Sequence, residues 1–550
     1  MSRIGLFLCE CGPNIAEAID LDKIAEFINK ENKVAGIERH RLLCSEEGKK
    51  FLAESIKQNQ FDHIVIAACS PKQHESTFME VLSQAGLNPY LLQLVNIREQ
   101  CAWMTPDKGL ATKKALRLIR AAINRVRFHS KLHEKEIEAN PDVVVIGAGM
   151  TGIETALSLA QQGRTVYLID KDKLGGMLKN LKRLFPGMLD PQRLLQEKIA
   201  EFNNQTQIKV FEDSQVKEIL GFFGNFIVTI INKEKEISLK AGSIVLGIGA
   251  QEFVPEGMDQ FGYGLKNVYT ALQFEKEGLT KIPDESKALA IIHCVGREKL
   301  GYCSKFCCVN SMKLAHLIKE KRPDIKVIQF YQELCLPGKE YDKFYRETRE
   351  KGIEFIRFDK IGVGKNGNQL ELKYGSGDGT EKHLNVDIVI LATGLIPNPE
   401  TKDFAQMLNI AVDDYGFFKE EHIKLGPVST LTDGIFIAGT CQGPKDIKES
   451  ILQAKAASGR ILSALIPGRK LPIEAKASEI SDSLCMGCGI CVQVCAYGAV
   501  SIDERKHISV VNEVLCRGCG NCAASCPSGA ASHRHFTNQQ LYYEAREILR

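Results

Sequence analysis

Residues 142–154 read Asp-Val-Val-Val-Ile-Gly-Ala-Gly-Met-Thr-Gly-Ile-Glu, an apolar run that passes directly into a glycine-rich turn. The run predicts a buried strand, and the residues Ile153 to Gln162 predict the amphipathic helix that follows it. In a G-x-G-x-x-G turn, Gly147 permits the tight turn, Gly149 lets the backbone approach a pyrophosphate, and Gly152 lets helix and strand pack closely. The stretch therefore predicts a parallel α/β unit that binds a dinucleotide, with the pyrophosphate at the helix N-terminus.

The second expected strand of this unit, Thr165–Ile169, ends at Asp170. An acid about 20 residues after the glycines binds the ribose hydroxyls in such units, and we expect Asp170 to do so. Strand-then-glycine segments follow at 243–250, 387–394 and 433–440. This order resembles flavoproteins of the thioredoxin-reductase type, in which an NAD(P)H domain interrupts the FAD domain.

The resemblance implies FAD, rather than NAD, in the first site. It adds Gly394, Gly439 and Thr440 to the expected cofactor contacts. Thr440 stands where these flavoproteins usually have an acid that contacts the flavin, so this contact departs from their pattern.

The interrupting domain is expected to open with the strand Ala288–Gly296, and a helix is expected to begin near Ser304. The glycine fingerprint between them is missing, and four cysteines spaced C-x8-C-x3-C-C stand there instead: Cys294, Cys303, Cys307 and Cys308. A strand-end loop beside a helix N-terminus suits an anionic cluster as well as it suits a phosphate. We therefore expect a [4Fe–4S] cluster in place of a nicotinamide pocket.

Two other interpretations of these cysteines remain open. A redox-active disulfide is disfavoured, because the adjacent pair Cys307-Cys308 would form a strained bridge and no C-x-x-C occurs in this domain. Unpaired core thiols are the other interpretation. Lys313 follows on the same helix and is a candidate catalytic residue that could approach the flavin, although an exposed surface lysine is the simpler interpretation.

The C-terminal segment contains the run C-x2-C-x2-C-x3-C twice. In two-cluster ferredoxins the fourth cysteine of each run binds the cluster of the other run. One [4Fe–4S] cluster is thus expected on Cys485, Cys488, Cys491 and Cys526, and the other on Cys516, Cys519, Cys522 and Cys495. A pair of zinc sites is the alternative, because C-x2-C pairs also bind zinc.

The N-terminal segment delivers further cysteines from three expected strands. The strand from Ile4 ends at Cys9 and Cys11, the strand Gly36–Leu43 ends at Cys44, and the strand His63–Ala68 ends at Cys69. Alternation with helices predicts a small parallel α/β unit, in which the carboxyl ends of the strands collect ligands at one edge. We expect a fourth [4Fe–4S] cluster there, with Cys101 as a spare or substitute ligand; buried core thiols are the alternative.

Composition limits the function classes. A chain of 550 residues with 19 cysteines and a formal charge of +3 is expected to be a metal-binding or redox protein of a reducing cytosol, with too little charge for nucleic acid. No signal peptide or membrane-length apolar run is recognised, so we expect a cytoplasmic protein.

The expected fold class is α/β, with a thioredoxin-reductase-like core and an α+β two-cluster ferredoxin domain. The expected domains are an N-terminal cluster domain (1–135), an FAD domain in two parts (136–285 and 386–470), a degenerate NAD(P)-type domain (286–385) and the ferredoxin (471–550).

The whole chain resembles the flavin-containing A subunit of heterodisulfide reductase. The resemblance rests on the cysteine group at 294–308, on the terminal ferredoxin and on four further motifs. These motifs are Leu8-Cys-Glu-Cys-Gly12, Ala67-Ala-Cys-Ser-Pro71, Asn96-Ile-Arg-Glu-Gln-Cys-Ala-Trp103 and Ala438-Gly-Thr-Cys-Gln-Gly-Pro-Lys-Asp446. In that family FAD receives two electrons from a partner and distributes them singly through clusters, and some members bifurcate them. The additional ferredoxin insert of methanogen versions is missing here.

The resemblance implies partners. These are separate disulfide-reductase-type acceptor subunits, a donor subunit of the hydrogenase or NADH-dehydrogenase type, ferredoxin, and a second copy of the chain in a homodimer. It leaves two alternatives: an electron-transfer adaptor without bifurcation, and an NAD(P)H-oxidising flavoprotein of the glutamate-synthase small-subunit type.

Overall fold

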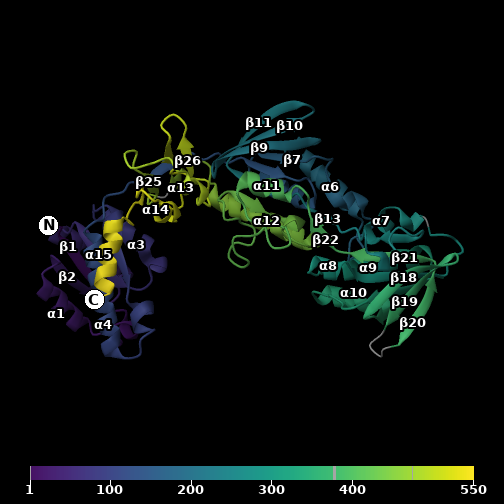
Figure 1. Cartoon of the computed structure of the whole chain (residues 1–550), viewed down its shortest axis with the longest axis horizontal. Helices are drawn as coiled ribbons and strands as arrows, with labels where there is room; N and C mark the ends of the chain where they lie inside the picture. The colour runs from purple at the N-terminus through teal and green to yellow at the C-terminus, as the bar shows by residue number, and fades with distance from the viewer. Residues whose placement is uncertain (1, 281, 376–379, 474, 550) are drawn as a thin grey trace. The chain divides into compact units, whose positions relative to one another are not determined.

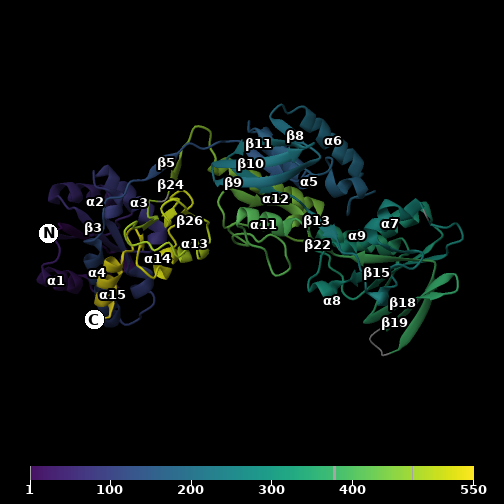
Figure 2. The same cartoon turned by 45° about the horizontal axis from the view of Figure 1, so that its top comes forward.

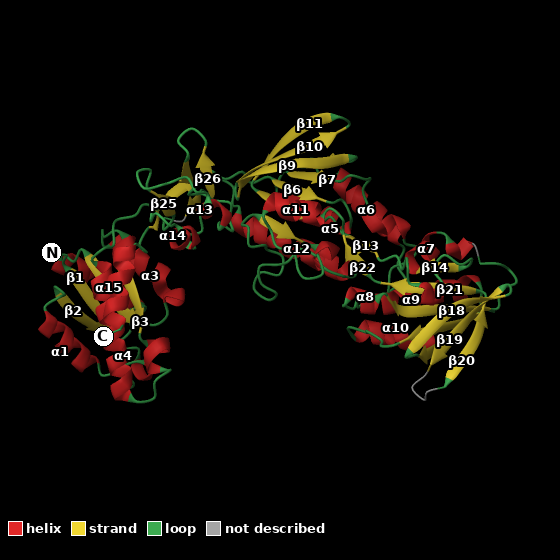
Figure 3. Cartoon of the chain, viewed as in Figure 1, coloured by secondary structure: helices red, strands yellow, loops and turns green. Residues whose placement is uncertain are grey.

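The computed structural model describes residues 2–280, 282–375, 380–473 and 475–549. They form two compact units (Figure 1). Unit 1 combines Met1–Ile137 with Pro472–Arg550, and unit 2 comprises Glu138–Leu471. Both units mix helices and strands (Figure 3), which confirms the expected α/β class.

The N-terminal part of unit 1 is a parallel sheet in the order β2-β1-β3-β4. Its strands are β1 (Ile4–Cys9), β2 (Gly36–His40), β3 (His63–Ala68) and β4 (Leu92–Asn96). The accompanying helices are α1 (Leu21–Glu31), α2 (Glu46–Asn59), α3 (Pro71–Gln84) and α4 (Lys108–Val126). Every residue of β1 is buried, as expected for a central parallel strand that is covered on both faces. The carboxyl ends of β1, β2 and β3 therefore lie along one edge of the sheet.

The C-terminal part of unit 1 is built from two similar halves. The antiparallel pairs are β25 (Ser478–Ile480) with β28 (Ala531–His533), and β26 (Val500–Asp503) with β27 (Ile508–Val511). Each half also has one short helix, α13 (Ile490–Gln493) or α14 (Asn521–Ser525). The chain ends in α15 (Asn538–Ile548), which packs against α4 in both views (Figures 1 and 2).

The contact between α15 and α4 joins the two ends of the chain in one unit. Arg125 donates to Glu544 at 2.6 Å, and the side-chain amide of Gln540 donates to the carbonyl of Phe128 at 2.9 Å. The Arg125 guanidinium also lies over the Phe536 ring, 4.6 Å from its centroid. The segments that the sequence suggests as separate first and last domains are therefore packed on each other.

Unit 2 begins with the sheet that carries the glycine turn. Its parallel strands, in the order β23-β12-β6-β7-β8, are β23 (Ile435–Ile437), β12 (Ser243–Leu246), β6 (Val143–Ile146), β7 (Val166–Ile169) and β8 (Ile208–Phe211). An antiparallel sheet packs with it, formed by β9 (Ser214–Phe222), β10 (Asn225–Asn232) and β11 (Lys235–Ala241). The helices of this part are α5 (Met150–Ala160), α6 (Pro191–Asn203), α11 (Thr401–Leu408) and α12 (Ile447–Ala464).

The second parallel sheet of unit 2 has the order β14-β21-β15-β16-β17. Its strands are β14 (Val268–Thr270), β21 (Ile388–Thr393), β15 (Ala288–Val295), β16 (Lys326–Tyr331) and β17 (Glu354–Arg357). The helices α7 (Ala271–Lys276), α8 (Arg297–Leu300), α9 (Cys307–Lys321) and α10 (Lys339–Glu350) accompany it, as does an antiparallel sheet of β18 (Lys360–Asn366), β19 (Gln369–Gly375) and β20 (Glu381–Val386).

The position of β21 differs from the expected domain boundary at residue 385. β21 pairs with β15 and β14, so residues 388–393 belong to the second sheet rather than to the sheet that carries the glycine turn. The chain passes between the two sheets through β13 (Ala250–Glu252) and β22 (Leu395–Pro397), which pair antiparallel. Among the helices of the described residues, none has the length and apolar composition needed to cross a membrane.

Candidate functional site

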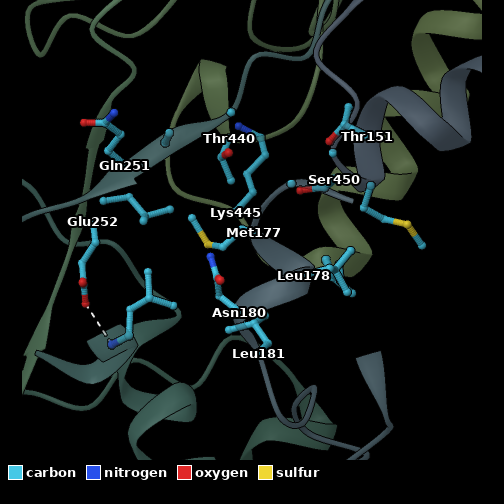
Figure 4. A pocket seen from close by; sticks show the side chains of 18 of the residues that line it. Thr151, Met177, Leu178, Asn180, Leu181, Gln251, Glu252, Thr440, Lys445 and Ser450 are labelled. Atoms are coloured by element: carbon cyan, nitrogen blue, oxygen red, sulfur yellow. Dashed lines mark hydrogen bonds between the residues drawn. The ribbon is translucent and has the colours of Figure 1, made fainter. Parts of the chain in front are cut away.

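A cavity of ≈ 760 Å³ in unit 2 lies where both parallel sheets contribute their strand ends. It is lined by the glycine turn after β6, the loop after β7, the crossing strand β13, the end of β21 and the start of α9. The segment between β23 and α12 also contributes. Figure 4 shows side chains that line the cavity, among them Thr151, Glu252, Thr440 and Lys445. The volume is in the range of ordinary cofactor pockets.

The three glycines of the turn differ in what surrounds them. Gly147 has a φ of 104° and lies so close to the Gly247 carbonyl that an added Cβ would be 2.3 Å from that oxygen. A Cβ on Gly152 would lie 1.8 Å from the Gly147 carbonyl oxygen, so this residue serves the packing of α5 on β6. A Cβ on Gly149 would meet nothing within 4 Å, which leaves open space at the N-terminus of α5. This combination fits a pyrophosphate that lies against the backbone at Gly149.

Asp170 follows β7 at the cavity wall. Its carboxylate accepts the backbone N–H of Ala148 at 2.5 Å and that of Asp172 at 2.8 Å. Burial raises the pKa of Asp170, and the two backbone hydrogen bonds oppose that rise. The carboxylate thus ties the loop after β7 to the glycine turn, and its remaining lone pairs suit the ribose hydroxyls that the sequence assigns to it.

The three later residues of the expected FAD site have different positions. Gly394 and Thr440 line the cavity. Gly439 supports it from behind: its φ is 79°, its N–H donates to the Gln453 side chain at 2.8 Å, and an added Cβ would lie 2.3 Å from Thr151 Oγ1.

Lys313 is not the exposed surface lysine that the simpler interpretation suggests. Its ammonium group donates to Glu275 at 2.6 Å, and the two side chains are 1% and 0% exposed. Glu275 lines the cavity and also accepts the backbone N–H of Lys182 at 2.7 Å, whereas Lys313 lies behind it. Burial lowers the pKa of Lys313, and the charge of Glu275 opposes this effect. Any action of Lys313 on a flavin would therefore pass through Glu275.

Glu252 is a cavity residue that the sequence does not single out. Its carboxylate accepts the backbone N–H of Leu272 at 3.0 Å and the hydroxyls of Thr270 at 2.8 Å and Thr393 at 3.1 Å. Figure 4 shows this carboxylate with one of its hydrogen bonds dashed. Burial raises its pKa against these hydrogen bonds. Because all three donors belong to the second sheet and its following helix, Glu252 fixes the crossing strand β13 to that sheet.

The cysteine group of the second sheet borders the same cavity. Cys307 lines it, together with its neighbour Phe306. Cys294 stands near the end of β15 with a φ of 61°, and the Cys303 sulfur accepts the Lys305 backbone N–H at 3.3 Å. The pKa of Cys307 is raised, first by its hydrogen bond to Cys308 and then by burial and the charges of Cys308, Cys303 and Cys294. The four thiols are therefore close enough to act on one another, as ligands of one cluster would be.

A fifth thiol, Cys335, belongs to this group and was not expected. Burial raises its pKa, with further increases from the charges of Cys303 and Cys308. It lies in the loop that follows β16, and its backbone donates a hydrogen bond to Cys308. Backbone groups of Glu333 and Gln332 in the same loop bond to Cys294. One signal could have identified Cys335. Because β16 lies next to β15 and parallel to it, the loop after β16 reaches the same sheet edge as the loop after β15.

The structure brings the four N-terminal thiols to one edge of the first sheet. Burial raises the pKa of Cys9 to about 11, and the charges of Cys11 and Cys44 add to that rise. The pKa of Cys69 is raised by burial and, more weakly, by Cys44. Cys101 packs with Ile4, Leu6 and Leu8 on the face of the sheet opposite to Cys9.

The ferredoxin-type cysteines lie in two related sets with backbone N–H donors. Backbone hydrogen bonds lower the pKa of Cys485, and the charge of Cys526, from the other run, opposes them. Burial raises the pKa of Cys522, with weaker increases from Cys516 and Cys519. Backbone N–H groups approach four of the sulfurs: Ser509 to Cys485 at 3.3 Å, Ala499 to Cys495 at 3.2 Å, Ser478 to Cys516 at 3.4 Å and Ala531 to Cys526 at 3.4 Å. Such N–H···S contacts are those that tune iron–sulfur clusters.

Within the described part of the chain, no group of three or more His, Cys, Asp or Glu side chains is arranged to hold a single metal ion. A single ion draws its ligands within direct bonding distance of one point, whereas the iron–sulfur core of a cluster holds its thiolates farther apart.

Comparison with known proteins finds two matching family models and several similar chains. Residues 141–460 match the family model described as pyridine nucleotide-disulphide oxidoreductase, and residues 484–530 match the 4Fe-4S dicluster domain. An iron–sulfur A subunit of the CoB–CoM heterodisulfide reductase of Methanopyrus kandleri is 32% identical over 92% of this chain and 91% of its own. The A subunit of the H(2):CoB-CoM heterodisulfide,ferredoxin reductase of Methanothermobacter thermautotrophicus is 31% identical over 91% of each chain. A solved thioredoxin reductase of T. acidophilum aligns with 58% of this chain and 97% of its own, at 18% identity and a TM-score of 0.43.

The matches cover both the cavity of unit 2 and the paired cysteine runs of unit 1, so the protein is an oxidoreductase with a flavoprotein domain and a two-cluster ferredoxin domain. With more than 30% identity over nearly its whole length, the chain belongs to the family of heterodisulfide reductase iron–sulfur A subunits.

Proposed function

We propose that the chain is the FAD- and [4Fe–4S]-containing electron-transfer subunit of a heterodisulfide-reductase-like complex, and that it splits a two-electron input at FAD into one-electron transfers. The observation that carries this proposal is that Cys307 and the glycine turn line one cavity. A cluster on Cys307 and its neighbours would then border the bound flavin.

FAD would supply the step between two-electron and one-electron chemistry. Gly147, Gly149 and Gly152 would hold its pyrophosphate at α5, Asp170 its ribose, and Gly394, Gly439 and Thr440 the rest of the cofactor. Glu275, held by Lys313, belongs to a buried acid–base pair at the cavity wall, and we assign it the movement of a proton at the flavin.

Four clusters would complete the electron path. We assign them to the ligand sets given by the sequence: the group at Cys294, Cys303, Cys307 and Cys308; the N-terminal group at Cys9, Cys11, Cys44 and Cys69; and the two ferredoxin sets. Cys335 would lie beside the first group as a fifth thiol whose backbone stabilises Cys308.

The partners follow from the same family. We propose disulfide-reductase-type acceptor subunits, a separate donor subunit, ferredoxin as a one-electron acceptor and a second copy of this chain, acting in the cytoplasm. Homologues are named as reductases of a heterodisulfide and ferredoxin, which supports both acceptors.

The experiment is anaerobic addition of NADH to the isolated, FAD-loaded chain. Cysteines replace the fingerprint glycines after β15, so the flavin absorbance should persist until donor subunits are added. Rapid bleaching by NADH alone would favour the NAD(P)H-oxidising alternative. The two one-electron potentials of the flavin then separate the remaining cases: a first reduction much harder than the second supports bifurcation, and the reverse order indicates a simple adaptor.

A further inference from the structure

The lysines that line the cavity of unit 2 are almost all engaged elsewhere. Those with partners are Lys171 with Glu400 at 2.6 Å, Lys173 with Asp213 at 2.6 Å, Lys179 with the Lys173 carbonyl at 2.7 Å, and Lys448 with Glu340. The ammonium groups of these four lysines therefore already have partners without a bound cofactor.

Lys445 is the exception among the described lysines of the cavity wall, because its ammonium group has neither an ion pair nor a hydrogen bond. Figure 4 shows it beside Thr440 in the cavity. Burial lowers its pKa. Partial removal of an ammonium group from water is costly unless an anion meets it, so this side chain is suited to a negatively charged partner in the cavity.

FAD offers two anionic parts, the pyrophosphate and the ring when it is reduced. The neighbours of Lys445 indicate which one it meets. The groups whose charges act on it are Cys441, Lys305, Glu449 and Glu420, and Lys305 and Glu449 are ion-paired with each other. Lys305 directly precedes Phe306 and Cys307, which form the cavity wall on the side of the cysteine group. The pyrophosphate, by contrast, has its own partner in the open N-terminus of α5 at Gly149.

The helix that follows Lys445 begins at the same place. α12 begins directly after Asp446, whose side chain accepts the Glu449 N–H at 2.8 Å. A helix N-terminus carries a partial positive charge, and Lys445 stands just before it. The Asp446 carboxylate caps this helix end, so the Lys445 ammonium group is the positive charge that would meet an electron-rich group at this end of the cavity.

We propose that Lys445 is the cation that offsets the negative charge gained by the flavin ring on reduction, and so sets how readily this chain accepts electrons. The proposal rests on FAD binding as proposed above. The side chain stabilises reduced FAD more than oxidised FAD, so its removal makes the flavin harder to reduce.

The test compares Lys445→Met with Lys445→Arg, which keeps the charge, and with Lys455→Met, a control on α12 whose lysine pairs with Glu154. FAD content is measured first. The flavin midpoint potential and the affinity for sulfite follow; sulfite adds its sulfur lone pair to the oxidised ring and leaves a negative charge on it. We expect Lys445→Met to keep FAD, to bind sulfite about tenfold more weakly and to lower the two-electron potential by the equivalent of about 30 mV. Lys445→Arg and Lys455→Met should behave like the unaltered chain.

An unchanged potential and sulfite affinity in FAD-loaded Lys445→Met would overturn the proposal. Loss of FAD from Lys445→Met that Lys445→Arg restores would also overturn it, because the lysine would then serve the pyrophosphate. If the unaltered chain binds no FAD, the proposed function fails instead, so the two failures are distinguishable.

Discussion

Cys307 and Gly149 line one cavity, although they stand at the starts of helices that belong to different sheets. Gly149 marks the open helix N-terminus that suits a pyrophosphate, and Cys307 belongs to a group of thiols that influence one another. The second sheet thus presents a thiol to the same cavity into which the first sheet brings its glycine turn. This relationship makes the cavity suited to a junction between two-electron and one-electron carriers.

The cysteine group can be tested by replacing Cys307 with serine. We expect the variant to lose about four irons per chain, as one [4Fe–4S] cluster holds four, and to retain FAD because the glycine turn is untouched. Electron transfer from reduced flavin to the other clusters should slow markedly in stopped-flow spectra. Cys441→Ser is the matched control, since Cys441 is also a buried thiol of unit 2 but belongs to none of the expected ligand groups. Full iron content in Cys307→Ser would contradict the assignment.

Substitutions at two glycines of the turn should have different effects, one on FAD binding and the other on stability. Gly149→Val fills open space, so we expect nearly normal stability but FAD binding weakened by about tenfold or more, since a hydrogen bond to a charged group is worth roughly 1.5–3 kcal/mol. Gly152→Ala drives a Cβ into the Gly147 carbonyl and should destabilise the domain by about 1–3 kcal/mol. Denaturant unfolding and flavin fluorescence separate the two effects. Equal loss of stability in both variants would contradict this division.

The buried ion pair between Lys313 and Glu275 can be tested by comparing the stability of single and double variants. Lys313→Met alone leaves an uncompensated buried carboxylate and should cost about 3–5 kcal/mol, whereas Lys313→Met with Glu275→Gln should recover most of that loss. If the pair also moves a proton at the flavin, the double variant stays slow in flavin reduction although it is stable. Recovery of both stability and rate would show that the pair is structural only.

Glu252 predicts a dependence of stability on pH. Its pKa is raised from an ordinary value of 4.5, so the folded chain binds the proton more tightly than the unfolded chain. Its contribution to the free energy of unfolding is therefore greatest below that ordinary value and falls as pH rises through the raised pKa. Glu252→Gln should remove this decline, which unfolding curves between about pH 4 and about pH 8 can measure. An identical pH profile in both proteins would contradict the raised pKa.

Much of this arrangement is visible in the sequence because it depends on local patterns. The strand His63–Ala68 has the bounds of β3, and the turn at Gly147 follows a buried strand as its glycine spacing predicts. The two ferredoxin runs carry their own spacing rule. In each case the residues that decide the structure are close together in the chain.

The rest depends on contacts between distant segments. Cys335 joins the cysteine group only because β16 pairs with β15, and β21 belongs to the second sheet because it pairs on the other side of β15. Lys313 is buried because Glu275, 38 residues earlier, meets it. The packing of α15 on α4 joins residues 419 positions apart, as in Arg125 with Glu544. Sequence periodicity does not report such pairings.

The most direct measurement is the iron and flavin content of the chain purified without oxygen. Four [4Fe–4S] clusters beside one flavin predict about sixteen irons per FAD. About eight irons per FAD would leave only the ferredoxin clusters, and would contradict the claim that cysteines at the flavin cavity and at the N-terminal sheet hold clusters of their own.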